Sequence, residues 1–375
     1  MDEPDEEPQP LPTFRKKLTG EDYKAIARLA GVVERTVRRV FEGTGDASRD
    51  AVIAAAIRHI EGEQPEALFG LVRPDVENQF FETLVSLLKR RLRSRRMLLT
   101  VVRSDEYVVG ELEDLRFMVG GGISGVFYAQ NPPLPTSIRY LTDVTKTPVV
   151  LVDVDVGASE LSDSHAWLGD DAVLVDNRDG IEQALGYLVN ENGHQVVAFL
   201  AGPHAASTAR ARLEAFRAAA GAYRLPSDDD LILHGDYTFA SGEAAANRLQ
   251  MLDRTGREPF PTAVICANDL MAAGLIKGLQ RAEIKVPDQM SIVGFDHIPL
   301  TEWWTPTIAT VDQKVANLAD AAISSMLAKL GKPSGATPDD RGPRLIAPEL
   351  KRGESVIHRD QAAPFSERVQ SDRSA

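Results

Sequence analysis

TAVICANDLMAAGLIKGLQRAEIKVPDQMSIVGFDHIPL, residues 262–300, carries the clearest structural signal in the chain. Two short apolar runs, residues 263–266 and 291–295, have the length of buried strands, and the residues between them have the spacing of an amphipathic helix. A strand, a helix and a second strand in this order predict a βαβ unit with parallel strands. Ligands of open α/β sheets bind beyond the carboxyl ends of the strands, so Asn268 and Asp296, which follow the two strands, are expected at a binding site.

The composition indicates a globular protein of two or three domains. The chain has 375 residues, of which 43% are hydrophobic and 26% charged, enough for a large core. A single cysteine excludes an internal disulfide framework and fits a reducing compartment. Because no run approaches a membrane span in length and the first nine residues are acidic, we expect a cytoplasmic protein with no membrane partner and no signal peptide.

A second informative stretch is YKAIARLAGVVERTVRRVFEG, residues 23–43, which has the spacing of a helix-turn-helix. Gly31 stands where the turn between the two helices needs a positive φ. Residues 14–60 carry 10 Lys or Arg against 6 Asp or Glu, although the whole chain has a formal net charge of −13. This asymmetry is compatible with a DNA-binding head on an acidic body, and also with a solvated pair of basic helices. On the second helix, the side chains expected to reach DNA are Glu34, Arg35, Thr36, Arg38 and Arg39.

These motifs together resemble the LacI/GalR family of bacterial transcriptional regulators. The resemblance rests on AND and VGFD within the opening stretch, on RLAGVVERTVRRV at residues 28–40 and on RPDVENQFF at residues 73–81. It implies an α/β fold, with a two-lobed core like a type I periplasmic binding protein and an N-terminal all-α helix-turn-helix domain. By position in the family's motifs, it implies an effector site formed by Asp75, Asn78, Phe81, Arg212, Tyr237, Asn268 and Asp296. Asp153, at the end of another expected strand, is either a further cleft residue or a turn former.

The chain departs from the family pattern in the head and in its connection to the core. Val33 and Arg38 replace two serines of the family's recognition helix, and valine cannot cap a helix. Only GEQPEA, residues 62–67, separates the expected third helix of the head from the first core strand, where the family has a hinge helix. Gly62 and Pro65 are unfavourable inside a helix, and seven extended residues span about 25 Å. We therefore expect no hinge helix and a head held close to the core.

The expected domain organisation follows from these motifs and from the three crossings between lobes that the resemblance implies. The segments are an acidic disordered tail at 1–17, the head at 18–61 with a third helix over 48–60, a linker at 62–67, the core at 68–355 and a disordered tail at 356–375. Within the core, lobe 1 is expected at about 68–175 and 313–345, and lobe 2 at about 176–312 and 346–355. Residues 345–356, LIAPELKRGESV, are expected to form a last strand pair.

The sequence contains no constellation typical of an enzyme. Its seven histidines are scattered, and it has no HExxH, GxSxG or Walker pattern. Cys266 lies inside an expected buried strand, and the glycines at 120–122 precede a strand instead of opening a helix, so a phosphate-binding loop is not expected. His297, beside Asp296, could serve as an acid or base, but a hydrogen bond to a ligand is the simpler role. We expect no catalysis, no cofactor and no metal.

The function expected from the sequence is that of a transcriptional regulator, acting as a repressor, whose binding to operator DNA is controlled by a small-molecule effector. A sugar or sugar-like metabolite is the first expectation for the effector, and a nucleobase or nucleoside the second. A homodimer is expected, because a small head needs two half-sites for tight binding. The alternative is a solute- or sugar-binding protein or sensor whose head does not bind DNA. The operator and the direction of the response stay open.

Overall fold

A computed structural model describes residues 19–21, 23, 24, 27, 34–41, 66–104, 107–155, 172–332 and 344–361. The chain forms two compact units, Met1–Glu66 and Ala67–Ala375, which are the head and the core. The expectations for residues 1–17, for the third head helix at 48–60, for linker residues 62–65 and for residues 362–375 lie outside the described part.

The head contains α2, Glu34–Phe41, where the sequence predicts the recognition helix. Residues 20, 21, 23, 24 and 27 are helical as well. Ala27 and Val37 are buried, with 6% and 0% of their surface exposed. These two apolar positions therefore face the interior of the head, as the helix-turn-helix spacing requires.

Lobe 1 is built on a parallel sheet with the strand order β11-β5-β4-β3-β1-β2. Its central strands are continuous apolar runs because helices cover both faces of the sheet. Helices α4 and α12 pack on one face, and α5, α6 and the π-helical turn η1 pack on the other. The bounds are β1 Ala67–Pro74, α4 Gln79–Arg93, β2 Met97–Ser104, α5 Val108–Gly120, β3 Gly125–Tyr128, α6 Pro135–Arg139, η1 Tyr140–Val144, β4 Val149–Val152, β5 Ala172–Val175, α12 Val315–Lys329 and β11 Arg344–Ile346.

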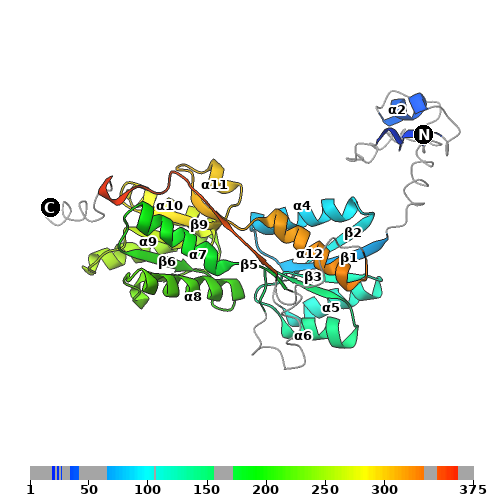
Figure 1. The fold of residues 1–375 in the computed structure, drawn as a ribbon, viewed down its shortest axis with the longest axis horizontal. Helices are drawn as coiled ribbons and strands as arrows, with labels where there is room; N and C mark the ends of the chain where they lie inside the picture. The colour runs from blue at the N-terminus through cyan, green and yellow to red at the C-terminus, as the bar shows by residue number, and fades with distance from the viewer. Residues whose placement is uncertain are drawn as a thin grey trace, which may run out of the picture. The chain divides into compact units, whose positions relative to one another are not determined.

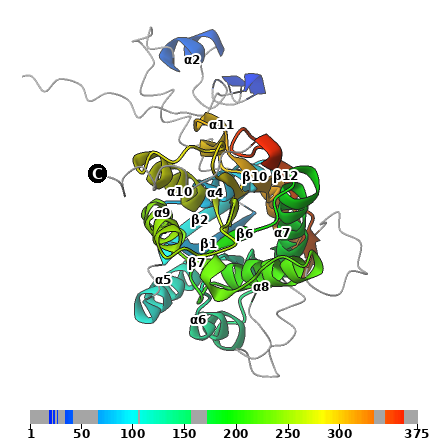
Figure 2. The ribbon, with the colours of Figure 1, turned by 90° about the vertical axis from the view of Figure 1, so that its left-hand side faces the viewer.

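Lobe 2 is built on a second sheet, with the order β12-β10-β9-β8-β6-β7, in which only the described pair β10 and β12 is antiparallel. Figure 2 shows α7 and α8 on one face of this sheet and α9 and α10 on the other. The bounds are α7 Asn177–Gly186, η3 Tyr187–Glu191, β6 Val197–Ala201, α8 Ser207–Ala222, η4 Asp229–Leu231, β7 Ile232–His234, α9 Phe239–Arg254, β8 Ala263–Cys266, α10 Asp269–Arg281, β9 Ser291–Asp296, α11 Leu300–Trp303, β10 Ala309–Asp312, β12 Glu349–Lys351 and η5 Arg359–Gln361.

The chain passes between the two sheets three times, after β5, after β10 and after β11, and both lobes lie side by side in Figure 1. The α/β fold class expected from the sequence is confirmed. One detail of the expectation is wrong: the last two strands do not pair with each other. β11 joins β5 in lobe 1 and β12 joins β10 in lobe 2, because the third crossing separates them.

The C-terminal segment is held on lobe 2 beyond the expected end of the core. The backbone amide of Ile357 donates to the Ser291 hydroxyl over 3.1 Å, and the amide of Arg359 donates to the Asn192 carbonyl over 2.8 Å. Residues 356–361 are therefore ordered, although the sequence placed them in a disordered tail. Their backbone groups find partners on a neighbouring strand and turn, which local composition does not reveal.

A buried histidine, His194, connects this segment to the lobe. Its Nε2 lies 3.2 Å from the Ile357 carbonyl, to which it must donate, and its Nδ1 lies 2.8 Å from the Thr262 hydroxyl. Burial lowers the pKa of His194 to about 4, so the folded protein holds this ring neutral.

This gives a prediction for stability against pH. In the unfolded chain a histidine binds a proton below about pH 6.5, and here the folded form does so only near pH 4, so stability is lost as the pH falls through this window. Between neutral pH and pH 4.5 the contribution of His194 to the free energy of unfolding should fall by roughly 2 to 3 kcal/mol. His194→Gln should remove that part of the pH dependence in urea unfolding followed by tryptophan fluorescence. The exposed His234→Gln is the control, and equal pH dependence in all three proteins would contradict the assignment.

Candidate functional site

Polar side chains converge at the carboxyl ends of the strands of both lobes, beside the three connections. Arg212 on α8 lies at the centre, with only 2% of its surface exposed. Its Nε donates to Oδ1 of Asn177 over 2.7 Å, and its Nη1 donates to the Ala267 carbonyl over 2.6 Å. The guanidinium carbon lies 3.8 Å from the centre of the Phe295 ring. These contacts fix the side chain and leave its charge facing Asp296.

Asp296, the last residue of β9, is 4% exposed and has a φ of 123°. Its Oδ1 lies 3.6 Å from Nη1 of Arg212 and also accepts from the side-chain amide of Gln313. Its Oδ2 accepts from Nδ2 of Asn78, a lobe 1 residue, over 3.2 Å. Burial raises the pKa of Asp296, and the positive charge of Arg212 opposes that rise.

A second buried carboxyl group, Asp269, shapes the turn that carries Asp296. It accepts from the Thr310 hydroxyl over 2.5 Å and from the backbone amide of Ile298 over 2.9 Å. Burial, and then the neighbouring Asp296, raise the pKa of Asp269 well above its usual range. The glycine of the VGFD motif makes room for it, since a Cβ on Gly294 would lie 2.1 Å from its Oδ1.

Several buried polar atoms at this place have no hydrogen-bond partner among the described residues. They belong to residues that follow three strands: Gln130 after β3, Asp153 after β4 and Gln313 after β10. Both side-chain polar atoms of Gln130 are unpaired, as are Oδ1 of Asp153 and Oε1 of Gln313. Burial raises the pKa of Asp153 to about 7, so near neutral pH this carboxyl group can both donate and accept. Unpaired buried polar groups are costly, so these atoms are suited to a polar ligand.

Direct hydrogen bonds join the two lobes around these residues. Asn131 of lobe 1 accepts from the backbone amide of Ser207 over 2.8 Å and donates to the Thr208 hydroxyl over 2.9 Å, both in lobe 2. The Ser207 hydroxyl accepts from the backbone amide of Asp155 over 3.1 Å. Helix α8 has no side-chain cap of its own, so Asn131 caps it from the other lobe.

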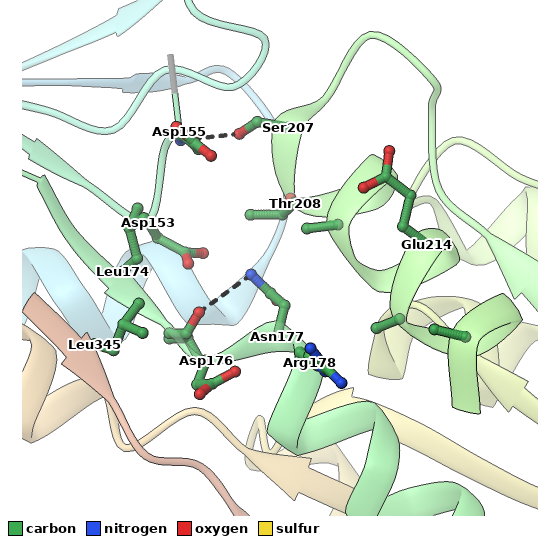
Figure 3. Close-up of a pocket in the computed structure, with 14 residues that line it drawn as sticks. Asp153, Asp155, Leu174, Asp176, Asn177, Arg178, Ser207, Thr208, Glu214 and Leu345 are labelled. Atoms are coloured by element: carbon green, nitrogen blue, oxygen red, sulfur yellow. Dashed lines mark hydrogen bonds between the residues drawn. The ribbon is translucent and has the colours of Figure 1, made fainter. Parts of the chain in front are cut away.

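A cavity of about 420 Å³ opens beside the cluster, between α8 and the first crossing, which follows β5. Figure 3 shows Ser207, Thr208 and Glu214 of α8 on one side of it and Asp153, just after β4, on the other. Arg212 and Asp296 themselves lie deeper, in the closed contact between the lobes. The volume falls in the range of small-molecule sites.

The structure brings together four of the seven effector residues expected from the sequence: Asn78, Arg212, Tyr237 and Asp296. The Tyr237 hydroxyl lies 3.1 Å from the hydroxyl of Thr208. Asn268 is close by, but its side chain caps α10 by accepting from Met271 and donates to the Tyr237 carbonyl. It therefore serves the fold with both of its polar atoms.

Two expected residues do not join the cluster. The side chain of Asp75 is 54% exposed and lies 3.6 Å from Arg103 on the neighbouring strand β2, which holds it at the rim of lobe 1. Phe81 packs edge-on against Phe80, with ring centres 5.2 Å apart, and no described contact links it to Arg212 or Asp296. The structure therefore places both side chains outside the buried cluster, next to neighbours on a strand and a helix of lobe 1.

Other residues of the cluster were not identified from the sequence: Gln130, Asn131, Asn177 and Gln313. Each lies just after a strand, so the rule that placed Asn268 and Asp296 could have found them. Strand ends are also common turn positions, and sequence spacing does not tell which of them face a partner lobe.

The expected DNA contacts on α2 fall into two groups. Glu34 and Arg38 form an ion pair with a 2.7 Å separation, and the Arg38 guanidinium lies 4.2 Å from the centre of the Tyr23 ring. Arg35 is exposed. The side chains of Thr36 and Arg39 lie outside the described part. Arg35 is therefore the described arginine of α2 that has its guanidinium available to another molecule.

The described residues hold no group of three or more His, Cys, Asp or Glu side chains placed to bind a metal ion. Their helices include none that is long and apolar enough to cross a membrane. His297 is half-buried, with Nε2 3.5 Å from Glu302 and Nδ1 3.7 Å from Asp312.

Comparison with known proteins places this geometry in context. Residues 187–356 match the periplasmic binding protein-like domain. The chain is 30% identical to the HTH-type transcriptional regulator MalR of Streptomyces coelicolor, an alignment that covers 87% of this chain and 93% of MalR. It is 26% identical to the HTH-type transcriptional repressor PurR of Photobacterium profundum, with 82% and 91% covered.

Solved structures agree with this assignment. The complex of the transcriptional regulator CelR with cellobiose superposes with a TM-score of 0.66 at 25% identity, covering 89% of this chain and 99% of CelR. The lac repressor dimer bound to operator has the same fold, with a TM-score of 0.64 at 20% identity over 88% of this chain and 98% of the repressor. With a head, a two-lobed core and relatives similar over nearly their whole length, the chain belongs to the LacI/GalR family of transcriptional regulators.

Proposed function

We propose that this regulator is a repressor whose operator binding is controlled by a neutral sugar or sugar-like metabolite held between the two lobes. The observation that carries the proposal is the buried cluster of Arg212, Asp296 and Asp153 with its unpaired neighbours. Because residues from both lobes form the cluster, a ligand bound there contacts both lobes. It can therefore stabilise one arrangement of the lobes relative to another. Binding of that kind can shift a conformational equilibrium.

The chemistry of the cluster favours a ligand rich in hydroxyl groups. Acceptor atoms dominate, since Asp153, Asp296, Gln130 and Gln313 each offer at least one oxygen. Two carboxyl groups against one guanidinium disfavour an anionic ligand such as a phosphate or carboxylate. Hydroxyl groups donate to carboxylates and accept from guanidinium groups, and adjacent hydroxyls on a ring match both.

A nucleobase or nucleoside is the second candidate, and the aromatic side chains favour it less. The Phe295 ring is covered by Arg212, and the Tyr237 ring packs against Gly202, where a Cβ would lie 2.5 Å from the ring. Arg212 therefore occupies one face of Phe295, and Gly202 occupies one face of Tyr237, which leaves less aromatic surface for a base to stack on. The CelR structure contains cellobiose, a neutral disaccharide, which supports the same order of candidates.

A prediction for effector binding follows. Neutral mono- and disaccharides, cellobiose and maltose among them, should be screened for those that raise the melting temperature, because binding to the folded state stabilises it by mass action. Asp296→Asn should weaken binding of the active sugar by about 10- to 150-fold, the loss of roughly 1.5 to 3 kcal/mol from a charged hydrogen bond. Asp75→Asn is the matched control and should bind normally in calorimetry. Equal affinities in both variants would refute the assignment of Asp296.

A second prediction concerns the head. Arg35→Ala should weaken binding to a selected operator by roughly 1 to 3 kcal/mol, because an exposed arginine on the recognition helix reads bases or holds phosphates. Lys24→Ala, which removes the same charge from the preceding helix, is the control. Fluorescence anisotropy on a duplex recovered by selection from random sequences measures both, and tight binding should require a dimer on two half-sites. An undiminished affinity of Arg35→Ala would exclude α2 as the reading helix.

The linker at residues 62–67 is predicted from the sequence to be too short for a hinge helix. If the head is held close to the core, ten Gly-Ser residues inserted after Gly62 should leave effector affinity unchanged. The same insertion should reduce the effect of the ligand on DNA affinity, whose coupling free energy is typically 1 to 3 kcal/mol. The control is an identical insertion after Ala363. A full ligand response in the linker variant would show that the length of the linker plays no part.

A further inference from the structure

Helix α4 ends in an exposed run of positive charge on a chain whose formal net charge is −13. Within residues 89–96 there are six cations and no acid. We call this set the α4 basic cluster: Lys89, Arg90, Arg91, Arg93, Arg95 and Arg96. All of them are exposed except Arg91, which is half-buried.

Few of these cations form an ion pair or a hydrogen bond within the described part of the protein. Arg91 pairs with Asp320 and donates to the Ala316 carbonyl over 2.7 Å, which ties α4 to α12. Arg95 donates to the Arg91 carbonyl over 3.3 Å. In the part of the chain that the structure describes, none of the other cluster residues lies within ion-pair distance of an acid.

Helix capping accounts for only part of the cluster, namely Arg90, Arg91 and Arg93 in the last turn of α4. Cations stabilise the carboxyl end of a helix only within its last turn, and α4 ends at Arg93. Arg95 and Arg96 lie beyond that turn. Neighbouring like charges repel each other, so the fold gains nothing from holding all of them together.

The cluster lies close to the start of the core within lobe 1. Ala67, the first residue of β1, is the register partner of Met97, the first residue of β2, and Arg96 directly precedes Met97. Figure 1 shows α4, β1 and β2 together in lobe 1. The chain joins the core to the head at Ala67, so the cluster lies at the end of lobe 1 from which the connection to the head departs.

The chemistry of the cluster fits a polyanion better than a protein or a membrane surface. Leu92, the apolar residue within the run, is buried, so the cluster offers no apolar anchor of the kind that protein interfaces and lipid surfaces need. Arginine binds phosphate groups in bidentate geometry, and clustered arginines neutralise several phosphates at once.

We propose that the α4 basic cluster binds the phosphate backbone of DNA next to the site that the head reads. The inference rests on the proposed DNA binding by the head and adds a second contact, made by the core. The sequence of this chain predicts no hinge helix in the linker, and such a contact would let the core bind the operator directly. Phosphate contacts carry no base preference, so the cluster acts on any sequence.

The test measures salt dependence on a mixed-sequence duplex of about 30 base pairs, between roughly 50 and 200 mM KCl, where each phosphate contact contributes about 0.9 to the slope of log affinity against log salt. The full-length chain carrying Lys89→Gln, Arg90→Gln and Arg93→Gln should lose about 2 to 3 from that slope and bind about tenfold more weakly or worse at low salt. The control carries Arg248→Gln, Arg254→Gln and Lys285→Gln, which removes the same charge from lobe 2, partly from the end of α9. It should keep the wild-type slope.

A conservative variant protects the test against a change in folding. Arg90→Lys with Arg93→Lys keeps the charge and should keep the slope, and all variants should melt within a few degrees of the wild type. An unchanged slope in the triple glutamine variant overturns this inference while DNA binding by the head stands. A wild-type chain that binds neither the mixed-sequence duplex nor a selected operator overturns the proposed function and this inference together. Arg35→Ala separates the two contacts, since it should reduce operator preference and retain the slope contributed by the α4 basic cluster.

Discussion

The buried guanidinium of Arg212 compensates the carboxyl groups that the fold gathers between its lobes. Removing charges from water is expensive, and a buried pair is stable only when further hydrogen bonds satisfy both partners. Asn177 and the Ala267 carbonyl do this for Arg212, and Gln313 and Asn78 do it for Asp296. The compensation is incomplete, because burial still raises the pKa of Asp153, Asp269 and Asp296. Acceptor oxygens such as Oδ1 of Asp153 and Oε1 of Gln313 therefore remain available to hydrogen-bond donors of a ligand.

The same helix that carries Arg212 also depends on the opposite lobe. The first amides of α8 have no side-chain cap within lobe 2, and Asn131 of lobe 1 accepts from the Ser207 amide in its place. Separating the lobes would expose that amide and break the Asn78 contact with Asp296. Both contacts are single hydrogen bonds, each worth about 1 kcal/mol net, so the closed arrangement can be altered by a ligand of ordinary affinity.

Helix α4 runs through lobe 1 from the buried cluster around Arg212 and Asp296 to the α4 basic cluster. Asn78 caps its first turn and donates to Asp296, while Arg90 and Arg93 lie in its last turn. A helix of 15 residues is about 22 Å long, so one rigid element connects the two regions. The formal net charge of −13 does not reveal this arrangement. It is a sum over the whole chain, in which the many acidic residues outweigh the six cations at the end of α4.

Local sequence was sufficient for the order of strands and helices, for the α/β class and for the corners at Asn268 and Asp296. Each of these depends on periodicity, turn chemistry and strand ends, which are properties of short segments. Which side chains meet was decided by packing between distant segments. Asp75 follows a strand just as Asp153 does, yet Arg103 on the neighbouring strand holds Asp75 at the rim, whereas burial brings Asp153 to the cluster. The split of the last two strands between lobes, and the ordering of residues 356–361 around His194, likewise depend on backbone partners more than 60 residues away along the chain. Sequence spacing does not indicate which distant residues come into contact, because those contacts form only when the chain packs into its tertiary structure.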